Sequence, residues 1–333
     1  MKKLCVLLSL LLCMGSFCSC SAEKKHSSTF YLMDTLIGVT LYTSDAAYAR
    51  EVFEGCEALL GELEGLWARQ KPESEIARFN ASTEGVSRLD ARTVALLETA
   101  LEVSAATEGA FDITVTPLAE LWEICGKEDR LPTDAEMKAA LALVDYSALH
   151  LSDGGLMKSD GALKVDLGGI GKGAAISLLI DYLKDTDVRG GLVSFGSNVA
   201  VFGEKPDGKP FRVALRHPRD ERGTVGTLTM SADTVLSVSG DYERYVTVGG
   251  ERYHHILNPH TGYPSSTGLA SVAVLAEDGA LADALSTALF VMGEERAMDF
   301  YASEMYKFEA VFVDENGNIR VTEGLRGLFV QED

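Results

Sequence analysis

Helix-forming and strand-forming patterns occupy different parts of this 333-residue chain, and this separation is the strongest constraint on its fold. In the first half, apolar residues recur every three or four positions, and capping residues such as Asp90 and Thr133 precede the helical runs. After Leu163, short apolar segments alternate with glycines. The predicted helices cover residues 45–66, 74–80, 90–107, 133–144, 171–184, 279–292 and 294–301, and the predicted strands cover 29–42, 162–167, 191–202, 211–217, 224–230, 235–239, 244–248, 268–275, 309–314 and 318–322. We therefore predict one α+β domain, with a helical lobe (residues 45–150) packed beside a mainly antiparallel sheet lobe.

The first twenty residues have the pattern of an export signal. Lys2 and Lys3 precede an apolar run at 6–12 that is too short to span a bilayer as a permanent helix. Ser19 and Cys20 end the segment in the manner of a bacterial lipoprotein signal, in which the cysteine becomes the lipidated N-terminus. We predict a signal peptide at 1–19, a tether at 20–29 and a folded domain at 30–333. Two acyl chains on Cys20 would anchor the exported domain to a bacterial membrane, on its periplasmic or another extracytoplasmic face. Secretion with cleavage nearby is the alternative.

The charge balance argues against nucleic acid as a partner. Fifty acidic residues outnumber thirty basic ones, giving a formal net charge of −20, and no basic cluster is present that would attract a polyanion. Signal cleavage would leave Cys20, Cys56 and Cys125, which are too few for a disulfide framework and lack zinc-ligand spacing. The sequence leaves open whether Cys56 and Cys125 pair.

A glycine-rich turn at residues 165–173 (VDLGGIGKG) leads from a predicted strand into a predicted helix. Its glycines allow a ligand to approach the backbone closely, and the helix N-terminus offers free N–H groups to an anion. Lys172 could add a positive charge. The spacing fits neither a phosphate-binding Walker loop nor a dinucleotide fingerprint, and a tight turn without a ligand is the alternative.

Asp283 and Thr287 lie four residues apart, so they share one face of the helix predicted at 279–292. A carboxylate and a hydroxyl held together suit a hard cation such as Mg²⁺, which also binds phosphate oxygens. The alternative is a carboxylate that stabilises the first helical turn and a Thr that bonds back to the helix.

Three of the six histidines lie within residues 253–264 (YHHILNPHTGYP), where Asn-Pro and Thr-Gly-Tyr-Pro indicate turns. One of them could act as a general base or contact a ligand. The polar, aromatic segment 239–245 (SGDYERY) and the segment 109–112 (GAFD) are further candidates, with ordinary turns as their alternative.

Taken in order along the chain, these segments resemble the ApbE family, the FAD:protein FMN transferases, also described as flavin-trafficking lipoproteins. The matching segments are Met33-Asp34-Thr35, PESEIARFN at 72–80, GAFD at 109–112, DLGGIGKG at 166–173, SGDYERY at 239–245, YHHILNPHTGYP at 253–264 and ADALSTALF at 282–290. The resemblance covers essentially the whole mature chain, and a lipoprotein signal is usual in the family. The resemblance implies a single T-fold-like domain.

The resemblance also implies a reaction. FAD would bind with Mg²⁺ at its pyrophosphate, and a Ser or Thr hydroxyl of an exported redox protein with a flavinylation motif would attack the FMN phosphorus, releasing AMP. Asp283 and Thr287 would ligate Mg²⁺ with the carbonyl of Gly171, and His255 and Asp283 are candidates for the general base. The residues that match flavin-nucleotide contacts are Met33, Gln70, Ala110, Phe111, Asp112, Gly168, Lys172, Ala174 and His255.

The chain departs from the family pattern at Gln70, where Tyr is usual. That aromatic is expected to help hold the flavin nucleotide, and Trp67 is a candidate replacement. Smaller departures are Gly171 for the commoner Ala and Ala174 for a usual Tyr. A less enclosed FAD could react with water instead, so an FAD pyrophosphatase that yields FMN and AMP is a second hypothesis. A lipoprotein that binds flavin without any reaction is a third.

Overall fold

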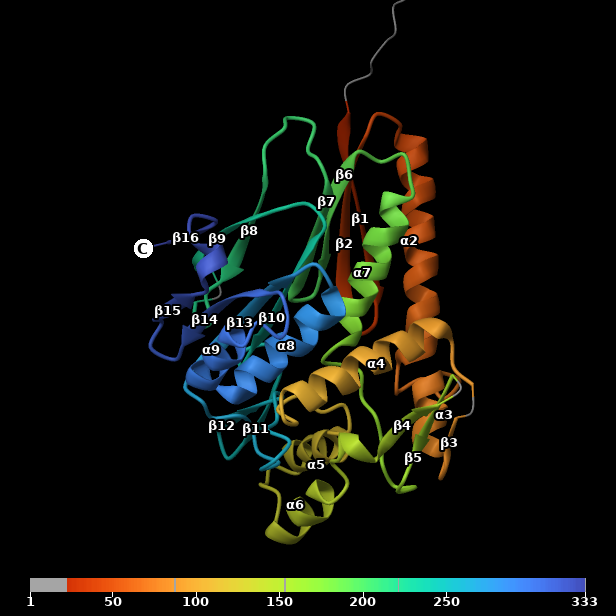
Figure 1. Ribbon diagram of the computed structural model, residues 1–333, viewed down its shortest axis with the longest axis vertical. Coiled ribbons are helices and arrows are strands. Elements are labelled where there is room, and N and C mark those ends of the chain that lie inside the picture. Colours follow the sequence, from red (N-terminus) through yellow and green to blue (C-terminus); the bar gives the residue numbers. More distant parts are fainter. Residues whose placement is uncertain (1–22, 87, 153, 221, 333) are drawn as a thin grey trace, which may run out of the picture.

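The computed structural model describes residues 23–332 except 87, 153 and 221, and its centre is one large antiparallel sheet (Figure 1). Its order is β1-β2-β6-β7-β10-β13-β14-β15, and every paired neighbour is antiparallel. The strands are β1 (Lys24–Leu32), β2 (Thr35–Thr43), β6 (Gly190–Phe195), β7 (Asn198–Gly203), β10 (Thr234–Gly240), β13 (Leu269–Ala276), β14 (Glu309–Asp314) and β15 (Ile319–Val321). The predicted α+β class and mainly antiparallel sheet are thus confirmed.

Three helices cover one face of this sheet: α2 (Ala46–Trp67), α7 (Gly171–Lys184) and α8 (Gly279–Met292). In Figure 1, α2 and α7 run side by side, and α8 crosses the end of α7. Strand alternation fixes which residues they bury: Ile37, Val39 and Leu41 of β2 point into the helix-covered core. Asp45 caps α2 by accepting hydrogen bonds from the amides of Ala47 and Tyr48, so the helix begins where the sequence predicts.

A smaller sheet packs on the opposite face. It consists of β8 (Phe211–Arg216), β9 (Thr224–Met230) and β16 (Phe329–Gln331), in the order β16-β9-β8. Its Leu215 and Leu228 join Leu236 of β10 and Val311 of β14 in a second hydrophobic core. The large sheet is therefore buried on both faces along part of its length.

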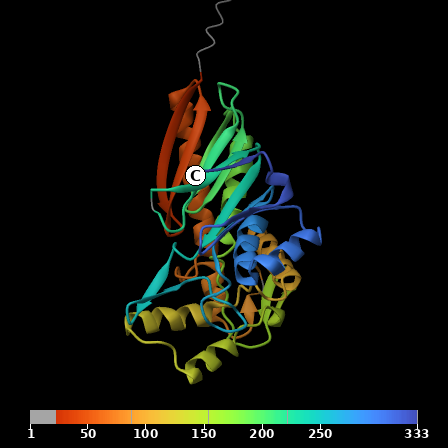
Figure 2. The same cartoon turned by 90° about the vertical axis from the view of Figure 1, so that its left-hand side faces the viewer.

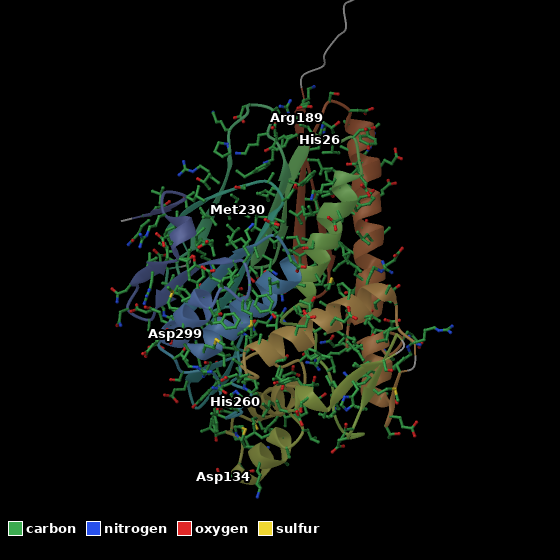
Figure 3. All side chains as sticks on the ribbon, viewed as in Figure 1. His26, Asp134, Arg189, Met230, His260 and Asp299 are labelled. Carbon is green, nitrogen blue, oxygen red and sulfur yellow. The ribbon has the colours of Figure 1, made fainter. Side chains whose placement is uncertain are left out.

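The remaining elements gather at one end of the molecule. They are α3 (Glu75–Ala81), β3 (Gly85–Val86), α4 (Ala91–Ala106), α5 (Thr116–Lys127), α6 (Asp134–Leu141), a 3₁₀ turn (Tyr146–Ala148), β4 (Leu149–Ser152), β5 (Gly155–Lys158), β11 (Tyr245–Val248) and β12 (Glu251–His254). Figure 2 shows β11 and β12 beside α5. Figure 3 places His260 and Asp134 toward this end, and His26 and Arg189 at the other end. The last two elements are α9 (Glu294–Ala302), which follows α8, and a 3₁₀ turn (Glu323–Leu325) between β15 and β16.

Several predicted elements differ from the structure. Residues 162–167 form no strand, because their backbone groups are bonded elsewhere. The side-chain amide of Asn80 donates to the carbonyl of Val165 and accepts its N–H, and the N–H of Asp166 donates to the carbonyl of Ile113. The segments 29–42 and 191–202 each divide into a hairpin, and β1 takes in residues 24–29 of the predicted tether. The helix α5 and the strands β3, β4, β5, β12 and β16 were not predicted.

The helices of residues 45–150 do not form one separate lobe. α2 and α4 share the main core with α7 and α8, whereas α5 and α6 surround a small cluster of their own around Trp122. Cys56 and Cys125 are separate, buried free thiols. Among the described residues no helix is long and apolar enough to cross a bilayer.

Candidate active site

A cavity of about 500 Å³ lies where the ends of the sheet strands meet the glycine-rich turn. Segments from most of the chain contribute to it: the residue after the β1–β2 turn, the segment after α4, the turn before α7, the β6–β7 turn, the end of β10 and the 253–259 region. Its wall includes eight of the predicted site residues, namely Ala110, Phe111, Asp112, Gly168, Lys172, His255, Asp283 and Thr287.

The glycine-rich turn is held in shape by its own polar groups. The Asp166 carboxylate accepts the N–H of Gly168 at 2.8 Å and the Nε of Arg69 at 2.7 Å, and Lys172 Nζ donates to the carbonyl of Gly168 at 2.9 Å. The helix α7 then begins at Gly171 without a side-chain cap. In its first turn the N–H of Gly171 donates to the carbonyl of Leu167 and the N–H of Gly173 donates to Asp283, while Lys172 between them lines the cavity. The positive end of the helix dipole therefore lies at the cavity wall and favours a negatively charged group there.

The turn and the Asp283 helix meet in space, as the resemblance to the ApbE family implies. The N–H of Gly173, in the first turn of α7, donates to Asp283 Oδ2 at 2.9 Å. The other carboxylate oxygen, Oδ1, accepts the Asn198 amide at 3.1 Å and the Ser237 hydroxyl at 2.8 Å. Asp283 is only 5% exposed, so these three donors fix its carboxylate at the cavity wall.

Two glycines allow α7 and α8 to approach closely enough for the hydrogen bond between Gly173 and Asp283. A Cβ added at Gly173 would lie 1.9 Å from the carbonyl oxygen of Gly279, and a Cβ added at Gly279 would lie 2.2 Å from the carbonyl oxygen of Gly173. Any side chain at either position would push α7 away from α8. The glycines of the two helices therefore set the position of Asp283.

Hydroxyl groups complete the polar wall beside Asp283. Ser239 Oγ lies 3.2 Å from Thr287 Oγ1 and 2.8 Å from Ser286 Oγ. In the part of the chain that the structure describes, no group of three or more His, Cys, Asp or Glu side chains is arranged for a metal. A cation here would depend on one carboxylate with hydroxyl and carbonyl oxygens. That donor set fits Mg²⁺, which uses one or two carboxylates together with water and substrate phosphates.

His255 faces the cavity with a defined tautomer. Its Nδ1 lies 3.1 Å from the carbonyl oxygen of Arg244, which can only accept, so the neutral ring carries its proton on Nδ1 and leaves Nε2 as an acceptor. The surrounding protein displaces water and, with Lys172 and Arg244 nearby, lowers the pKa of His255 to about 4. The ring is still accessible from the cavity, so a neutral acceptor nitrogen is available at neutral pH.

Asp112 is also on the wall, in a buried setting. Its carboxylate accepts the amide and hydroxyl of Thr114 at 2.7 and 2.6 Å and the amide of Tyr146 at 3.2 Å. Burial raises the pKa of Asp112, and the hydrogen bonds counteract part of that effect. The neighbouring Phe111 ring lies against Gly169, where an added Cβ would be 3.2 Å from it.

Four predicted site residues do not line the cavity. The amide of Met33 donates to Glu64 Oε1 at 2.8 Å, and it is Thr35, on the other side of the β1–β2 turn, that lines the wall. Gly171 and Ala174 are buried in the first turn of α7. Gln70 is exposed in the turn after α2. Its predicted contact with the flavin nucleotide therefore gains no support from the geometry.

The proposed replacement of the missing aromatic by Trp67 is wrong. The Trp67 ring is buried in the main core, and its Nε1 donates to Thr93 Oγ1 at 3.1 Å, away from the cavity wall. The neighbour that does line the cavity is Arg69, which is paired with Asp166 at 2.7 Å and with Glu123 at 3.4 Å.

Sequence analysis missed Asn198 and Ser237, which orient Asp283, and the wall residues Arg69 and Thr35. Asn198 follows a Gly-Ser pair between two apolar segments, so a hairpin turn could have been recognised there. Ser237 is a small polar residue within an otherwise apolar strand, which is the usual signal of a buried polar contact. Neither signal identifies Asp283 as the partner.

Comparisons with known proteins agree with this arrangement. The family model described as "ApbE family" matches residues 33–312. The FAD:protein FMN transferase of Vibrio cholerae is 33% identical over 298 residues, covering 89% of both chains, and that of Treponema pallidum is 27% identical, covering 96% of this chain and 93% of its own.

Among solved structures, the apo form of the flavinyl transferase ApbE from Pseudomonas stutzeri is 31% identical, with a TM-score of 0.81 over 92% of this chain and 97% of its own. The ApbE protein of Thermotoga maritima is 30% identical, with a TM-score of 0.82 over 92% and 99%. Sequence motifs, fold and cavity thus agree, and the chain belongs to the ApbE family.

Proposed function

We propose that this protein is an Mg²⁺-dependent FAD:protein FMN transferase that attaches FMN to a Ser or Thr hydroxyl of an exported redox protein. The observation that carries the proposal is the fixed Asp283 carboxylate, joined to the start of α7 in a cavity of nucleotide size. Relatives called FAD:protein FMN transferases, about 30% identical over most of the chain, support the same assignment.

Asp283 and Thr287, which both line the cavity, would hold Mg²⁺ at the pyrophosphate of FAD. The third ligand that the family resemblance implies, the carbonyl of Gly171, belongs to a buried residue that does not line the cavity. A bound Mg²⁺ would supply positive charge against the phosphate charge that develops in the transition state. The positive end of the α7 dipole and Lys172 would add positive potential on the same side. An acidic protein needs such local compensation to bind a diphosphate.

In the reaction, the acceptor oxygen forms a bond to the FMN phosphorus, and the bond from that phosphorus to the oxygen of the AMP phosphate breaks. His255 suits the role of base better than Asp283. Both carboxylate oxygens of Asp283 already accept hydrogen bonds, whereas Nε2 of His255 is an acceptor at the cavity. We therefore assign to His255 the proton of the hydroxyl and to Asp283 the metal.

Export and lipid anchoring belong to the same proposal. Cys20 lies outside the described residues, so the case rests on the sequence pattern around it. Lipidation at Cys20 would place the enzyme at the membrane surface, near exported redox proteins. Metabolic labelling with palmitate should modify the wild-type protein and leave C20A unlabelled, and an unlabelled wild-type protein would contradict the anchor.

The decisive experiment uses the purified protein, FAD, Mg²⁺ and a flavinylation-motif acceptor protein. Covalent flavin fluorescence on the acceptor in a denaturing gel, with one AMP released per FMN attached, is the expected result. AMP and FMN without labelled acceptor would indicate an FAD pyrophosphatase, and intact FAD would indicate a flavin-binding protein.

A further inference from the structure

A second, smaller cavity of about 230 Å³ lies between the large sheet and the β8–β9–β16 sheet. Aliphatic side chains form most of its wall, from β7, β8, β9, β10, β13 and β14. They are Val199, Val213, Leu215, Val225, Leu236, Val238, Ala273, Val311 and Val313. The polar lining side chains, from Ser197, Arg216, Tyr242, Glu243 and Ser271, are outnumbered by these aliphatic ones, so the cavity favours a largely apolar occupant.

The second cavity adjoins the catalytic cavity. Gly196, Ser197, Val238 and Glu243 line both. Gly196 and Ser197 belong to the β6–β7 turn and Val238 to the end of β10, so these residues separate the two cavities. A molecule with one group in the catalytic cavity could therefore place a neighbouring group in the second.

Its size and chemistry exclude the flavin nucleotide. Sites for molecules of that size are usually 300–1,000 Å³ and carry polar groups for phosphate and ribose. An apolar cavity of roughly 150 Å³ is enough for a benzene-sized group. The second cavity therefore fits one or two apolar side chains.

The rim has the features of a binding edge for polypeptide. Arg216 pairs with Glu243 at 2.9 Å, and its guanidinium lies 4.6 Å from the centre of the Tyr242 ring. Beyond the shared wall, Tyr31 and Leu36 form a directly opposed pair on β1 and β2 and are 67% and 64% exposed. Leu36 is joined to the wall because its carbonyl accepts the N–H of Gly196 at 3.4 Å.

This exposed pair faces the same side of the sheet as the second cavity. Leu36 and Tyr42 are six residues apart on β2 and so point to one face, and Tyr42 packs against the core beneath the smaller sheet. The strand β8, whose residues 213–216 line the cavity, is an edge strand of the smaller sheet among the described elements. An extended segment could add to such an edge and direct alternate side chains inward.

We propose that the second cavity binds an apolar side chain of the acceptor polypeptide, close in sequence to the Ser or Thr that receives FMN. The inference rests on the proposed function, because it needs a polypeptide acceptor in the catalytic cavity. It adds a specificity site: an acceptor is chosen by an apolar residue at a fixed offset from its hydroxyl.

The test uses a library of twelve-residue peptides with one central Thr and all other positions randomised without Ser or Thr. The protein is incubated with the library, FAD and Mg²⁺, and the fluorescent products are sequenced by mass spectrometry. We expect Leu, Ile, Val, Met or Phe to be enriched at one offset from the flavinylated Thr. Labelled peptides without such enrichment would overturn the inference and leave the proposed function intact.

Two peptides that differ only at that offset, Leu against Ala, then test the cavity itself. The wild-type protein should favour the Leu peptide by roughly tenfold or more in kcat/KM, the fold-change that corresponds to burying one aliphatic side chain. V213F fills the cavity from β8 and should bring this ratio close to one. V330F is the matched control, since Val330 is 54% exposed on β16 of the same sheet and does not line the cavity.

V213M is a second variant at the same half-buried position, and its flexible side chain enters the cavity with less strain during folding. Thermal unfolding and FAD cleavage without peptide should be unchanged in V213M and V330F, which separates loss of the subsite from loss of the enzyme. A ratio that stays high in both V213F and V213M would contradict the assignment. Release of AMP with no peptide labelled at all would contradict transfer to polypeptide, and with it this inference.

Discussion

Asp283 shows how one residue can depend on contacts made across the whole fold. Its three donors are the Gly173 amide, the Asn198 side-chain amide and the Ser237 hydroxyl, and each lies on a different element. Because every donor points at the carboxylate, the negative charge is stabilised while it stays at the cavity wall. A cation at the pyrophosphate would need this negative charge of Asp283 as its ligand.

Replacing Asp283 by Asn should therefore remove the metal-dependent reaction. The amide removes the negative charge and presents N–H groups to donors that need an acceptor, so Mg²⁺-dependent AMP release should fall by roughly two orders of magnitude or more. AMP release at several Mg²⁺ concentrations measures the effect. D278N is the matched control: Asp278 caps α8 by accepting the Leu281 amide, and Asn caps a helix equally well. An equal loss in both variants would argue against a metal role.

His255 links the cavity to the pH dependence of stability. The pKa of His255 is lowered to about 4 by loss of surrounding water, whereas an ordinary histidine titrates near 6.5. As the pH falls from 6.5 to 4, the unfolded chain takes up a proton that the folded protein does not. The free energy of unfolding should therefore decrease over this window, and the residue should have no such effect above pH 6.5.

The variant H255N should reduce this acid loss of stability. Urea unfolding between pH 4 and 8 should give a shallower slope below pH 6.5 than in the wild-type protein, with no change of slope above it. H150Q provides the control, because His150 is an exposed histidine that bonds Ser159 on the surface of β4 and β5. Identical slopes in H255N and the wild-type protein would show that the imidazole is not held neutral.

At the scale of elements, the crossing of α7 and α8 is the contact that assembles the site. Helices with ordinary side chains between them are 8–10 Å apart at their axes. Glycines at positions 173 and 279 remove the side chains at the crossing, so the backbone of α7 can reach the Asp283 carboxylate directly. The main core around Leu179, Leu285 and Leu289 stabilises both helices in this position.

G173A should separate the helices and disturb the site together. The added methyl group would overlap the Gly279 carbonyl and the Asp283 side chain, so we expect a loss of about 1–3 kcal/mol in the free energy of unfolding. Metal-dependent AMP release should fall as well. Urea unfolding and an AMP assay on the same sample provide both measurements.

G61A is the matched control for this helix substitution. Gly61 lies inside α2, and an added Cβ would have no atom within 4 Å. The variant should therefore gain about 0.5–1 kcal/mol of stability through helix propensity and keep its activity. A G173A protein as stable and active as G61A would refute the role of the close crossing.

For the whole molecule, the cavity joins segments from residue 35 to residue 287. A ligand that contacts all of them binds only the folded chain, so it should stabilise the entire domain. If Mg²⁺ bridges the pyrophosphate to Asp283, FAD and Mg²⁺ together should stabilise the protein more than either alone.

Thermal unfolding with FAD, with Mg²⁺ and with both tests this coupling. At a free ligand concentration 100 times Kd, the expected gain is about 2.7 kcal/mol. Since a turnover would consume FAD, the scan is made without acceptor and AMP is measured at its end. EDTA should remove most of the extra stabilisation that FAD and Mg²⁺ give together, and the D283N variant should not gain this extra stabilisation. If FAD raises the thermal stability equally with and without Mg²⁺, the proposed metal bridge is contradicted.

The local sequence pattern determined most helices and most strands of the large antiparallel sheet. It also determined that Asp283 and Thr287 lie on one face of a helix. These follow from spacings of two and 3.6 residues and from caps such as Thr133 with Glu136, whose capping box is present. The helix α5 was not predicted, although Pro117 at its start is a usual helix signal. It also predicted a strand at 162–167 because the segment is apolar.

Tertiary structure alone decided how the site is assembled. The donors to Asp283 lie 110, 85 and 46 residues away along the chain, and the backbone of Val165 is bonded by a side chain 85 residues away. It also decided that Trp67 enters the core while Arg69 faces the cavity. A periodic pattern reports which face of an element is apolar, but not which distant polar group meets it. Those pairings form only when buried polar groups must find partners inside a packed fold.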